Sequence, residues 1–247
     1  ANKYGKVNTI GLCHGVQNGH QLIADVFGLE KEEVDIVCAG INHQTWYIKI
    51  QHDGEDLTGD LLEALENHPE YSKTEKVRID MLKRFGYFST ESNGHLSEYL
   101  SWYRKRPEEI KDWISLDKWI HGETAGYLRK CIEARNWFET DFPNWMEEPA
   151  NKFDYEDRSQ EHGSYIVEGL ETGRVYRGHF NVENEGTITN LPDDAIVEVP
   201  GYVDATGVNI PKVGDLPMGC AAVCNNSIEV QRLAVEAAVN GDDQLLR

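Results

Sequence analysis

The stretch that most constrains the fold is VDIVCAGINHQTWYIKI, at residues 34–50. It contains two runs rich in β-branched and aromatic residues, VDIVCAG and QTWYIKI, around the short segment AGINH. In the second run polar and apolar residues alternate, which is typical of a strand with one buried face. A chain of 247 residues is long enough to bury a core against such a face. The stretch therefore predicts two strands of a sheet.

Segments with helical patterns flank these strands. VQNGHQLIADVFG, at 16–28, predicts a helix that ends at its final glycine, preceded by a short apolar strand at 7–13. The apolar spacing over 56–85 is helical, and residues 227–247 predict an amphipathic helix that stops at a glycine near its end. Several short strands with turns are expected within 177–217. Segregated pieces of this kind predict an α+β fold with mixed short strands and helices rather than a repeated βαβ unit.

Charge and composition exclude several classes of function. The net charge of −19 argues against nucleic acid and against an anionic membrane surface as partners, since both require clustered Lys and Arg. The sequence lacks a run of about 18 apolar residues, so we expect no membrane span. The five cysteines show no disulfide framework, which indicates a reducing cytoplasm. These features fit a soluble protein that acts on a small molecule.

Three segments place chemically active side chains where apolar runs end. They are GLCHG with Cys13 and His14, AGINH with Asn42 and His43, and ESNGHLSEY, which starts at Glu91. Sites are commonly assembled at strand ends. One cysteine and one histidine make up half of the ligand shell of a borderline-soft divalent ion and leave positions open for substrate and water. The alternative is structural, with a packed thiol and a hydrogen-bonded core histidine.

Two further groups of side chains have both a chemical and a structural interpretation. Cys220 and Cys224 in CAAVC could hold a metal on a helix, or could pack beneath the last helix. His95, Glu98 and Tyr99 could exchange protons, or could belong to a capped helix start. In both cases the residues alone favour the structural interpretation.

The middle of the chain, residues 105–157, is highly charged and rich in tryptophan, which predicts surface helices or a solvated excursion. Its aromatic side chains and those just before it could stack on sugars, but clusters of this type more often form core or an oligomer interface. The tryptophans concerned are Trp102, Trp113, Trp119, Trp137 and Trp145.

Five blocks of the sequence together resemble the family 4 glycoside hydrolases, most closely their α-galactosidase (melibiase) branch. The blocks occur in the family's order and at similar spacing, and they cover nearly the whole chain. They are GLCHGVQ (11–17), CAGINHQTWY (38–47), FGYFSTESNGHLSEYLSWYRK (85–105), NEGTITNLPDDAIVEVPGYVDATGV (184–208) and KVGDLP (212–217). The resemblance implies the C-terminal, substrate- and metal-binding domain of that family's fold, which is similar to that of lactate and malate dehydrogenases.

The resemblance also implies roles for individual residues. Cys13 and His43 would bind a divalent ion, manganese or another, and His14 would protonate the leaving group. Glu91 would be the base that removes the C2 proton of the sugar. The residues implied in substrate binding are Asn42 and His95.

The family's reaction, as the resemblance implies, uses NAD as well as the metal ion. The C3 hydroxyl is oxidised by hydride transfer, which acidifies the C2 proton; the aglycone is then eliminated, water adds, and the hydride returns. On this basis we expect hydrolysis of α-galactosides such as melibiose. The alternatives are the same reaction on α-glucosides or α-galacturonides, for which Arg104 and Lys105 offer charge, and a non-catalytic oligomerisation module.

The organisation of the chain departs from the family in one respect. The sequence contains neither a Gly-rich dinucleotide fingerprint nor the family's Asn-Pro-Met block. We therefore expect residues 1–247 to be the C-terminal domain, with 1–15 as the end of the preceding dinucleotide-binding region. NAD would then be bound mostly by an N-terminal Rossmann half that this chain lacks. Homo-oligomers, dimers or tetramers, are expected.

Overall fold

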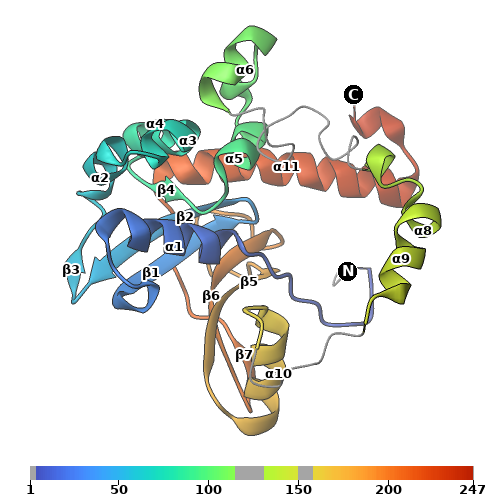
Figure 1. Cartoon of the computed structure of the whole chain (residues 1–247). Helices are drawn as coiled ribbons and strands as arrows, with labels where there is room; N and C mark the ends of the chain where they lie inside the picture. The colour runs from blue at the N-terminus through green and yellow to red at the C-terminus, as the bar shows by residue number, and fades with distance from the viewer. Residues whose placement is uncertain (1–3, 115–130, 150–157, 247) are drawn as a thin grey trace.

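The computed structural model describes residues 4–114, 131–149 and 158–246, and one antiparallel sheet organises them (Figure 1). The strand order is β3-β2-β1-β6-β5, with β4 paired to β2 and β7 paired to β6. The α+β class expected from the sequence is confirmed. The strands are β1 (Val34–Ile41), β2 (Gln44–His52), β3 (Glu55–Asp56), β4 (Phe88–Ser89), β5 (Tyr176–Glu183), β6 (Ile196–Asp204) and β7 (Gly207–Asn209).

β1 and β2 are the two strands expected from the sequence, and they form a tight hairpin. Ile41 pairs with Gln44, so only Asn42 and His43 connect the strands. His43 has a φ of 66°, in the left-handed region that short turns use. The hairpin therefore holds His43 at its tip.

Helices α1 (Gly15–Phe27) and α2 (Leu61–Asn67) cover one face of the sheet (Figure 1). α1 ends as expected, where Gly28 adopts a φ of 68° that costs a residue without a side chain little. Alternate side chains of β1 point to this face, and among them Cys38 packs in the same cluster as Ile23 of α1.

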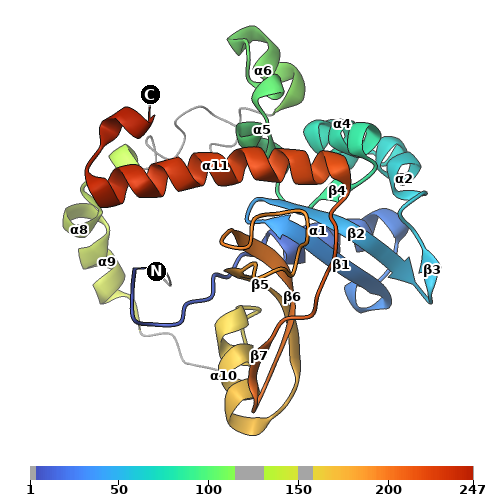
Figure 2. The same cartoon turned by 180° about the vertical axis from the view of Figure 1, so that it is seen from behind.

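The long helix α11 (Met218–Asn240) crosses the opposite face, as the view from behind shows (Figure 2). Ala39 and Trp46, which neighbour the residues facing α1, pack here with Cys220 and Cys224 of α11. The helix begins at Met218 and not near Ser227 as the sequence predicted. Its first turns contain Gly219, Asn225 and Asn226, which favour a helix weakly, and burial of Cys220 and Cys224 against the sheet stabilises them. The predicted stop at Gly241 is confirmed.

Shorter helices complete the described part of the chain. The helical pattern over 56–85 corresponds to separate helices, since the chain turns at His68 and Glu75. The remaining helices are η1 (Lys31–Glu33), α3 (Tyr71–Thr74), α4 (Lys76–Phe85), α5 (Asn93–Tyr99), η2 (Ser101–Tyr103), α6 (Pro107–Trp113), α8 (Trp137–Thr140), α9 (Phe142–Glu147), α10 (His162–Thr172) and η3 (Asp243–Leu246).

One strand prediction was wrong, and another was confirmed apart from the length of the strands. The strand expected at 7–13 is reduced to one bridge, in which Gly11 exchanges backbone hydrogen bonds with Asn181 of β5. On the N-terminal side of Gly11 there is little strand to pair with, because β5 ends at Glu183, two residues after Asn181. The strands with turns expected within 177–217 are β5, β6 and β7, of which β5 and β6 are longer than expected and β7 is short. Among the described residues no helix combines the length and the apolar character needed to cross a membrane.

The tryptophans serve different purposes. Trp113 packs against the core and meets Tyr103 edge to face. Trp137 and Trp145 belong to an exposed aromatic group on α8 and α9. Trp119 lies outside the described residues. The core interpretation is thus confirmed for Trp113.

Candidate functional site

The segment before α1 carries Cys13 into the site. His14 is the N-cap of α1, and the first turn begins at Gly15. A Cβ on Gly15 would lie 3.8 Å from Cys13 Sγ and 3.5 Å from Glu91 Oε2, so both atoms sit against this first turn. Burial raises the pKa of the Cys13 thiol, while hydrogen bonds with the Gly15 backbone and the Asn42 side chain oppose the rise.

The tip of the β1–β2 hairpin brings His43 to the same place. Its Nδ1 lies 3.0 Å from the Tyr99 hydroxyl, and its ring stacks on His95 with centroids 5.5 Å apart. Its Nε2 lies 3.4 Å from Glu91 Oε2. Because Tyr99 engages Nδ1, Nε2 is the nitrogen that faces the acidic group.

Glu91 follows β4 and is buried at the start of α5. Its Oε1 accepts a hydrogen bond of 2.8 Å from the Ser92 N–H and lies 3.2 Å from His95 Nδ1. Burial alone would raise the pKa of Glu91, but the hydrogen bonds from His95 and Ser92 and the nearby His43 outweigh it and lower the pKa to about 2. The carboxylate is therefore ionised at neutral pH, with Oε2 turned toward His43. Ser92 is the N-cap of α5, so the capped helix start is confirmed.

Cys13, His43 and Glu91 converge on one point. Each offers one ligand atom, and these atoms all lie within 4.8 Å of one another. In the described part of the chain this is the one group of three or more such side chains close enough to share an ion. Thiolate, imidazole and carboxylate are the ligand types that divalent transition metals take, so the donor set fits a metal of this kind.

His14 does not join this cluster, although it follows Cys13 directly. Its Nε2 lies 3.0 Å from Glu161 Oε2, and its ring stacks on His162 of α10 with centroids 6.0 Å apart. The imidazole is half-exposed. Its immediate partners thus lie at the start of α10, Glu161 being the N-cap of that helix, and not among the residues around Glu91.

His162 is a structural residue of the site that the sequence did not indicate. One ring nitrogen lies 3.3 Å from the Cys13 carbonyl oxygen and the other 2.6 Å from the Tyr176 hydroxyl. Since a carbonyl can only accept, Nε2 carries the hydrogen that binds Cys13. Burial lowers the pKa of His162, which keeps the ring neutral. His162 and Cys13 are separated by 149 positions of sequence, so no local pattern could have indicated their contact.

Glu198 on β6 is a second residue missed by the sequence reasoning. Its side chain is 1 % exposed, and Oε2 lies 2.5 Å from the Thr45 hydroxyl. The available signal was a single acid inside the apolar run IVEVP. Burial, opposed by the Thr45 hydrogen bond and by His43, raises the pKa of Glu198 to about 7.

Cys220 and Cys224 are packed in the core, as their structural interpretation predicted. Burial raises the pKa of both thiols, that of Cys224 to about 11. The Cys224 thiol donates to the Gln44 carbonyl at 3.3 Å. Neither belongs to the cluster around Glu91.

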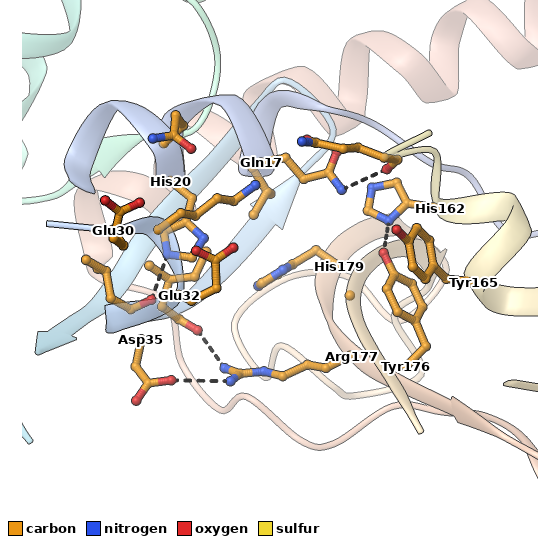
Figure 3. A pocket seen from close by; sticks show the side chains of 17 residues that line it. Gln17, His20, Glu30, Glu32, Asp35, His162, Tyr165, Tyr176, Arg177 and His179 are labelled. Carbon is orange, nitrogen blue, oxygen red and sulfur yellow. Dashed lines mark hydrogen bonds and ion pairs between the residues drawn. The ribbon is translucent and has the colours of Figure 1, made fainter. Parts of the chain in front are cut away.

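A separate cavity of about 630 Å³ lies between α1, β1, β5 and α10 (Figure 3). Its polar side chains are largely engaged with the protein itself: His20 with the Val34 carbonyl, Arg177 with the Ile36 carbonyl, and His179 with the Cys38 N–H. None of the three residues of the metal-type cluster lines it. The cavity and the cluster are therefore different places.

The sequence and the fold are similar to those of known proteins. Residues 38–247 match the Family 4 glycosyl hydrolase C-terminal domain. The alpha-galactosidase of Rhizobium meliloti (strain 1021) is 57% identical over 246 residues, covering 99% of this chain and 50% of that protein. The chain thus spans about half the length of the curated relatives it matches.

Solved structures share the fold. The putative glucosidase lplD from Bacillus subtilis superposes with a TM-score of 0.75 at 24% identity, over 97% of this chain and 57% of that chain. A 6-phospho-alpha-glucosidase from gut microorganisms, solved in complex with NAD and Mn2+, gives a TM-score of 0.66 at 20% identity, over 95% of this chain and 54% of that chain. At these identities the likeness establishes the fold alone.

Proposed function

Because the chain belongs to family 4 of the glycosyl hydrolases, we propose that it forms the sugar- and metal-binding part of an α-galactosidase that requires NAD and Mn²⁺. The convergence of Cys13, His43 and Glu91 carries this proposal. The name of the Rhizobium relative supports the substrate class, and the glucosidase solved with NAD and Mn2+ supports the cofactors. NAD is proposed to bind mainly to the part of such an enzyme that this chain does not span.

Cys13 and His43 are proposed to hold the ion. The bound metal would act as a Lewis acid toward sugar oxygens. The protein's own contribution is orientation: Tyr99 holds His43 Nδ1, and His162 holds the Cys13 carbonyl. These contacts aim Sγ and Nε2 at one point before the ion arrives, which reduces the ordering that binding requires.

Glu91 could serve as a metal ligand or as the catalytic base, and its geometry favours the role of ligand. As a ligand, Oε2 would complete a set of three with Sγ of Cys13 and Nε2 of His43. As a base, the expectation from the resemblance, it would take the C2 proton. The ionised carboxylate suits both tasks, but a base works best with a pKa near the operating pH, and that of Glu91 is about 2.

His14, His95 and Asn42 are proposed to act on the sugar. His14 is half-exposed beside Glu161, which can orient the imidazole as it gives a proton to the leaving oxygen. His95 and Asn42 adjoin Glu91 and Cys13, where a sugar bound to the ion would lie.

A neutral sugar is favoured over a uronate. Arg104, a candidate for binding a carboxylate, donates to Ser97 Oγ at 2.9 Å and lies 3.5 Å from Glu98. Its guanidinium group is thus already paired within the protein and is not available to a substrate carboxylate. We expect turnover of an α-galactoside to exceed that of the matching α-glucoside and α-galacturonide by at least about tenfold, which corresponds to about 1.4 kcal/mol of transition-state binding.

Titration of the metal-free chain with Mn²⁺, followed by calorimetry, tests the metal site directly. Cys13→Ser and His43→Ala should each weaken binding by at least about tenfold while the circular dichroism spectrum stays unchanged. Cys131→Ser and His52→Ala are the matched controls, because both side chains lie away from the cluster. Undiminished Mn²⁺ affinity in either site variant would refute the ligand assignment.

Glu91→Gln separates the two tasks of Glu91. If Glu91 is a ligand, Mn²⁺ affinity falls. If it is a base, affinity holds, and in the complete enzyme supplied with NAD exchange of the C2 deuterium of a labelled α-galactoside slows. Homo-oligomerisation and a cytoplasmic location stay predictions, which sedimentation and cell fractionation would check.

A further inference from the structure

A row of residues crosses the sheet from one metal-binding turn to the other. Thr45 pairs with Gly40, Gly40 pairs with Glu198, and Glu198 pairs with Asn181 across β2, β1, β6 and β5. Asn181 in turn bridges to Gly11. The row therefore starts two residues after His43 and ends two residues before Cys13. Three of its members carry polar side chains, and all three of these are buried.

Glu198 stands at the centre of this row in an environment that does not favour a charge. The residue is 1 % exposed, its carboxyl is hydrogen-bonded to Thr45, and the Asn181 side chain lies nearby. Oε1 has no hydrogen-bond partner among the described residues, and neither has the neighbouring Asn181 Oδ1. An ionised carboxylate with one unsatisfied oxygen and no cation bonded to it carries a large desolvation penalty.

The hydroxyl of Thr45 shows where the hydrogen lies. Thr45 Oγ1 is 2.8 Å from the Ile41 carbonyl oxygen and 2.5 Å from Glu198 Oε2. The hydroxyl has one hydrogen, and the Ile41 carbonyl can only accept, so Thr45 donates to Ile41. The short contact between Thr45 Oγ1 and Glu198 Oε2 then needs a hydrogen from the glutamic acid.

We propose that Glu198 is protonated in the folded chain and positions the metal-binding turn by donating its proton to Thr45. The chain of hydrogen bonds runs from Glu198 to Thr45 to the Ile41 carbonyl, and it spans the turn that carries His43. That turn requires support, because His43 adopts a φ of 66°, which costs a residue with a side chain about 1 kcal/mol or more. Glu198 is thus a positioning residue and does not itself contact the ion.

The charges around Glu198 agree with this assignment. Burial is the largest influence on its pKa and raises it, as does the charge of Glu91. These influences outweigh those that lower it, which are a hydroxyl hydrogen donated by Thr45 to the ionised form, the charge of His43 and the nearby Asn181 side chain. The result, a pKa of about 7, leaves the acid mostly protonated at about pH 6.

The first test asks about the proton and is independent of any metal. The infrared spectrum of the full chain at about pH 6 should contain the carbonyl band of a buried, protonated carboxylic acid. Glu198→Gln should remove it, whereas Glu183→Gln, a change at an exposed glutamate on the adjacent strand, should not. If the wild-type spectrum contains no such band, or if Glu198→Gln leaves the band in place, the proposal is overturned.

The second test asks about position and rests on the proposed metal site. Glutamine can donate to Thr45 as the protonated acid does, so Glu198→Gln should keep Mn²⁺ affinity within about threefold of wild type. Glu198→Ala and Thr45→Val should weaken it by about tenfold or more, and Thr45→Ser should restore it. Circular dichroism establishes that each variant is folded. Wild-type affinity in Glu198→Ala, or a loss in Glu198→Gln equal to that in Glu198→Ala, would overturn the positioning role.

The nuclear magnetic resonance signals of the His43 ring separate this proposal from the proposed function. In the metal-free chain they should shift in Glu198→Ala and stay unchanged in Glu198→Gln. If wild type bound no Mn²⁺ and the ring signals still followed this pattern, the metal function would fail and the positioning role would stand. Ring signals that are the same in both variants and in wild type would refute the positioning role whatever the metal result.

Discussion

Replacing Glu198 with glutamine should change how the stability of the chain depends on pH. In the folded chain the pKa of Glu198 is raised from 4.5 to about 7, so the folded state binds this proton more tightly than the unfolded state does. Stability from this group is then fully present below about pH 4.5 and is lost as pH rises through about 7. Glutamine cannot ionise, so the variant lacks this loss.

The size of the effect follows from the same two values. The difference between 4.5 and about 7 corresponds to about 3 kcal/mol, at about 1.4 kcal/mol for each tenfold change in proton affinity. No discount for solvent screening applies, because the side chain is 1 % exposed. Relaxation and water entry on ionisation make this figure an upper estimate. Relative to wild type, Glu198→Gln should gain between about 1 and 3 kcal/mol as pH rises from about 4.5 to about 8.

Urea unfolding at a series of pH values measures this difference directly. The charged and titratable groups that interact with Glu198 are His43, Glu91, Cys13, Cys38 and Tyr47, and all are present in the variant as well as in wild type. The comparison therefore isolates Glu198. Glu183→Gln serves as the control and should follow wild type at every pH, because that carboxylate is exposed. The reasoning would be refuted if the free energies of unfolding of Glu198→Gln and wild type differed by an amount that stays constant within about 0.5 kcal/mol across this pH range.

Three other substitutions have definite expectations. Gly40→Ala should destabilise the chain by at least about 2 kcal/mol in urea unfolding, because its Cβ would lie 2.3 Å from a backbone oxygen of β2; a loss below about 0.5 kcal/mol would contradict this. Gly28→Ala should cost only about 1 kcal/mol, since the space is open and only the φ of 68° is unfavourable; equal losses for the two glycines would be inconsistent with the steric argument. Arg78→Met should cost about 3 kcal/mol by thermal denaturation, because the buried guanidinium donates twice to the Ser89 carbonyl and stacks 4.0 Å from Phe88; an unchanged melting temperature would argue against that network.

Local patterns predicted the elements that a short stretch of sequence can encode. The alternation in QTWYIKI and the apolar spacing before Gly28 correspond to β2 and α1, because strand and helix periods are properties of adjacent residues. The start of α11 could not be predicted in this way, since its first turns contain residues of low helix propensity, Gly219, Asn225 and Asn226, and their helix is stabilised by packing on the sheet. The bridge at Gly11 depends on where β5 ends and therefore on the sheet as a whole.

The sequence by itself determined the α+β class, the two strands around AGINH and, through its resemblance to a family, the identity of the chemical groups. Only the tertiary structure decided which groups meet. It turned His14 toward Glu161, and it brought Glu198 to Thr45 across 153 positions of sequence. Contacts of this range are set by strand register and by the packing of helices on the sheet, which no local period records. For the same reason the proton on Glu198 is a property of burial and of its partners, and not of the residue type alone.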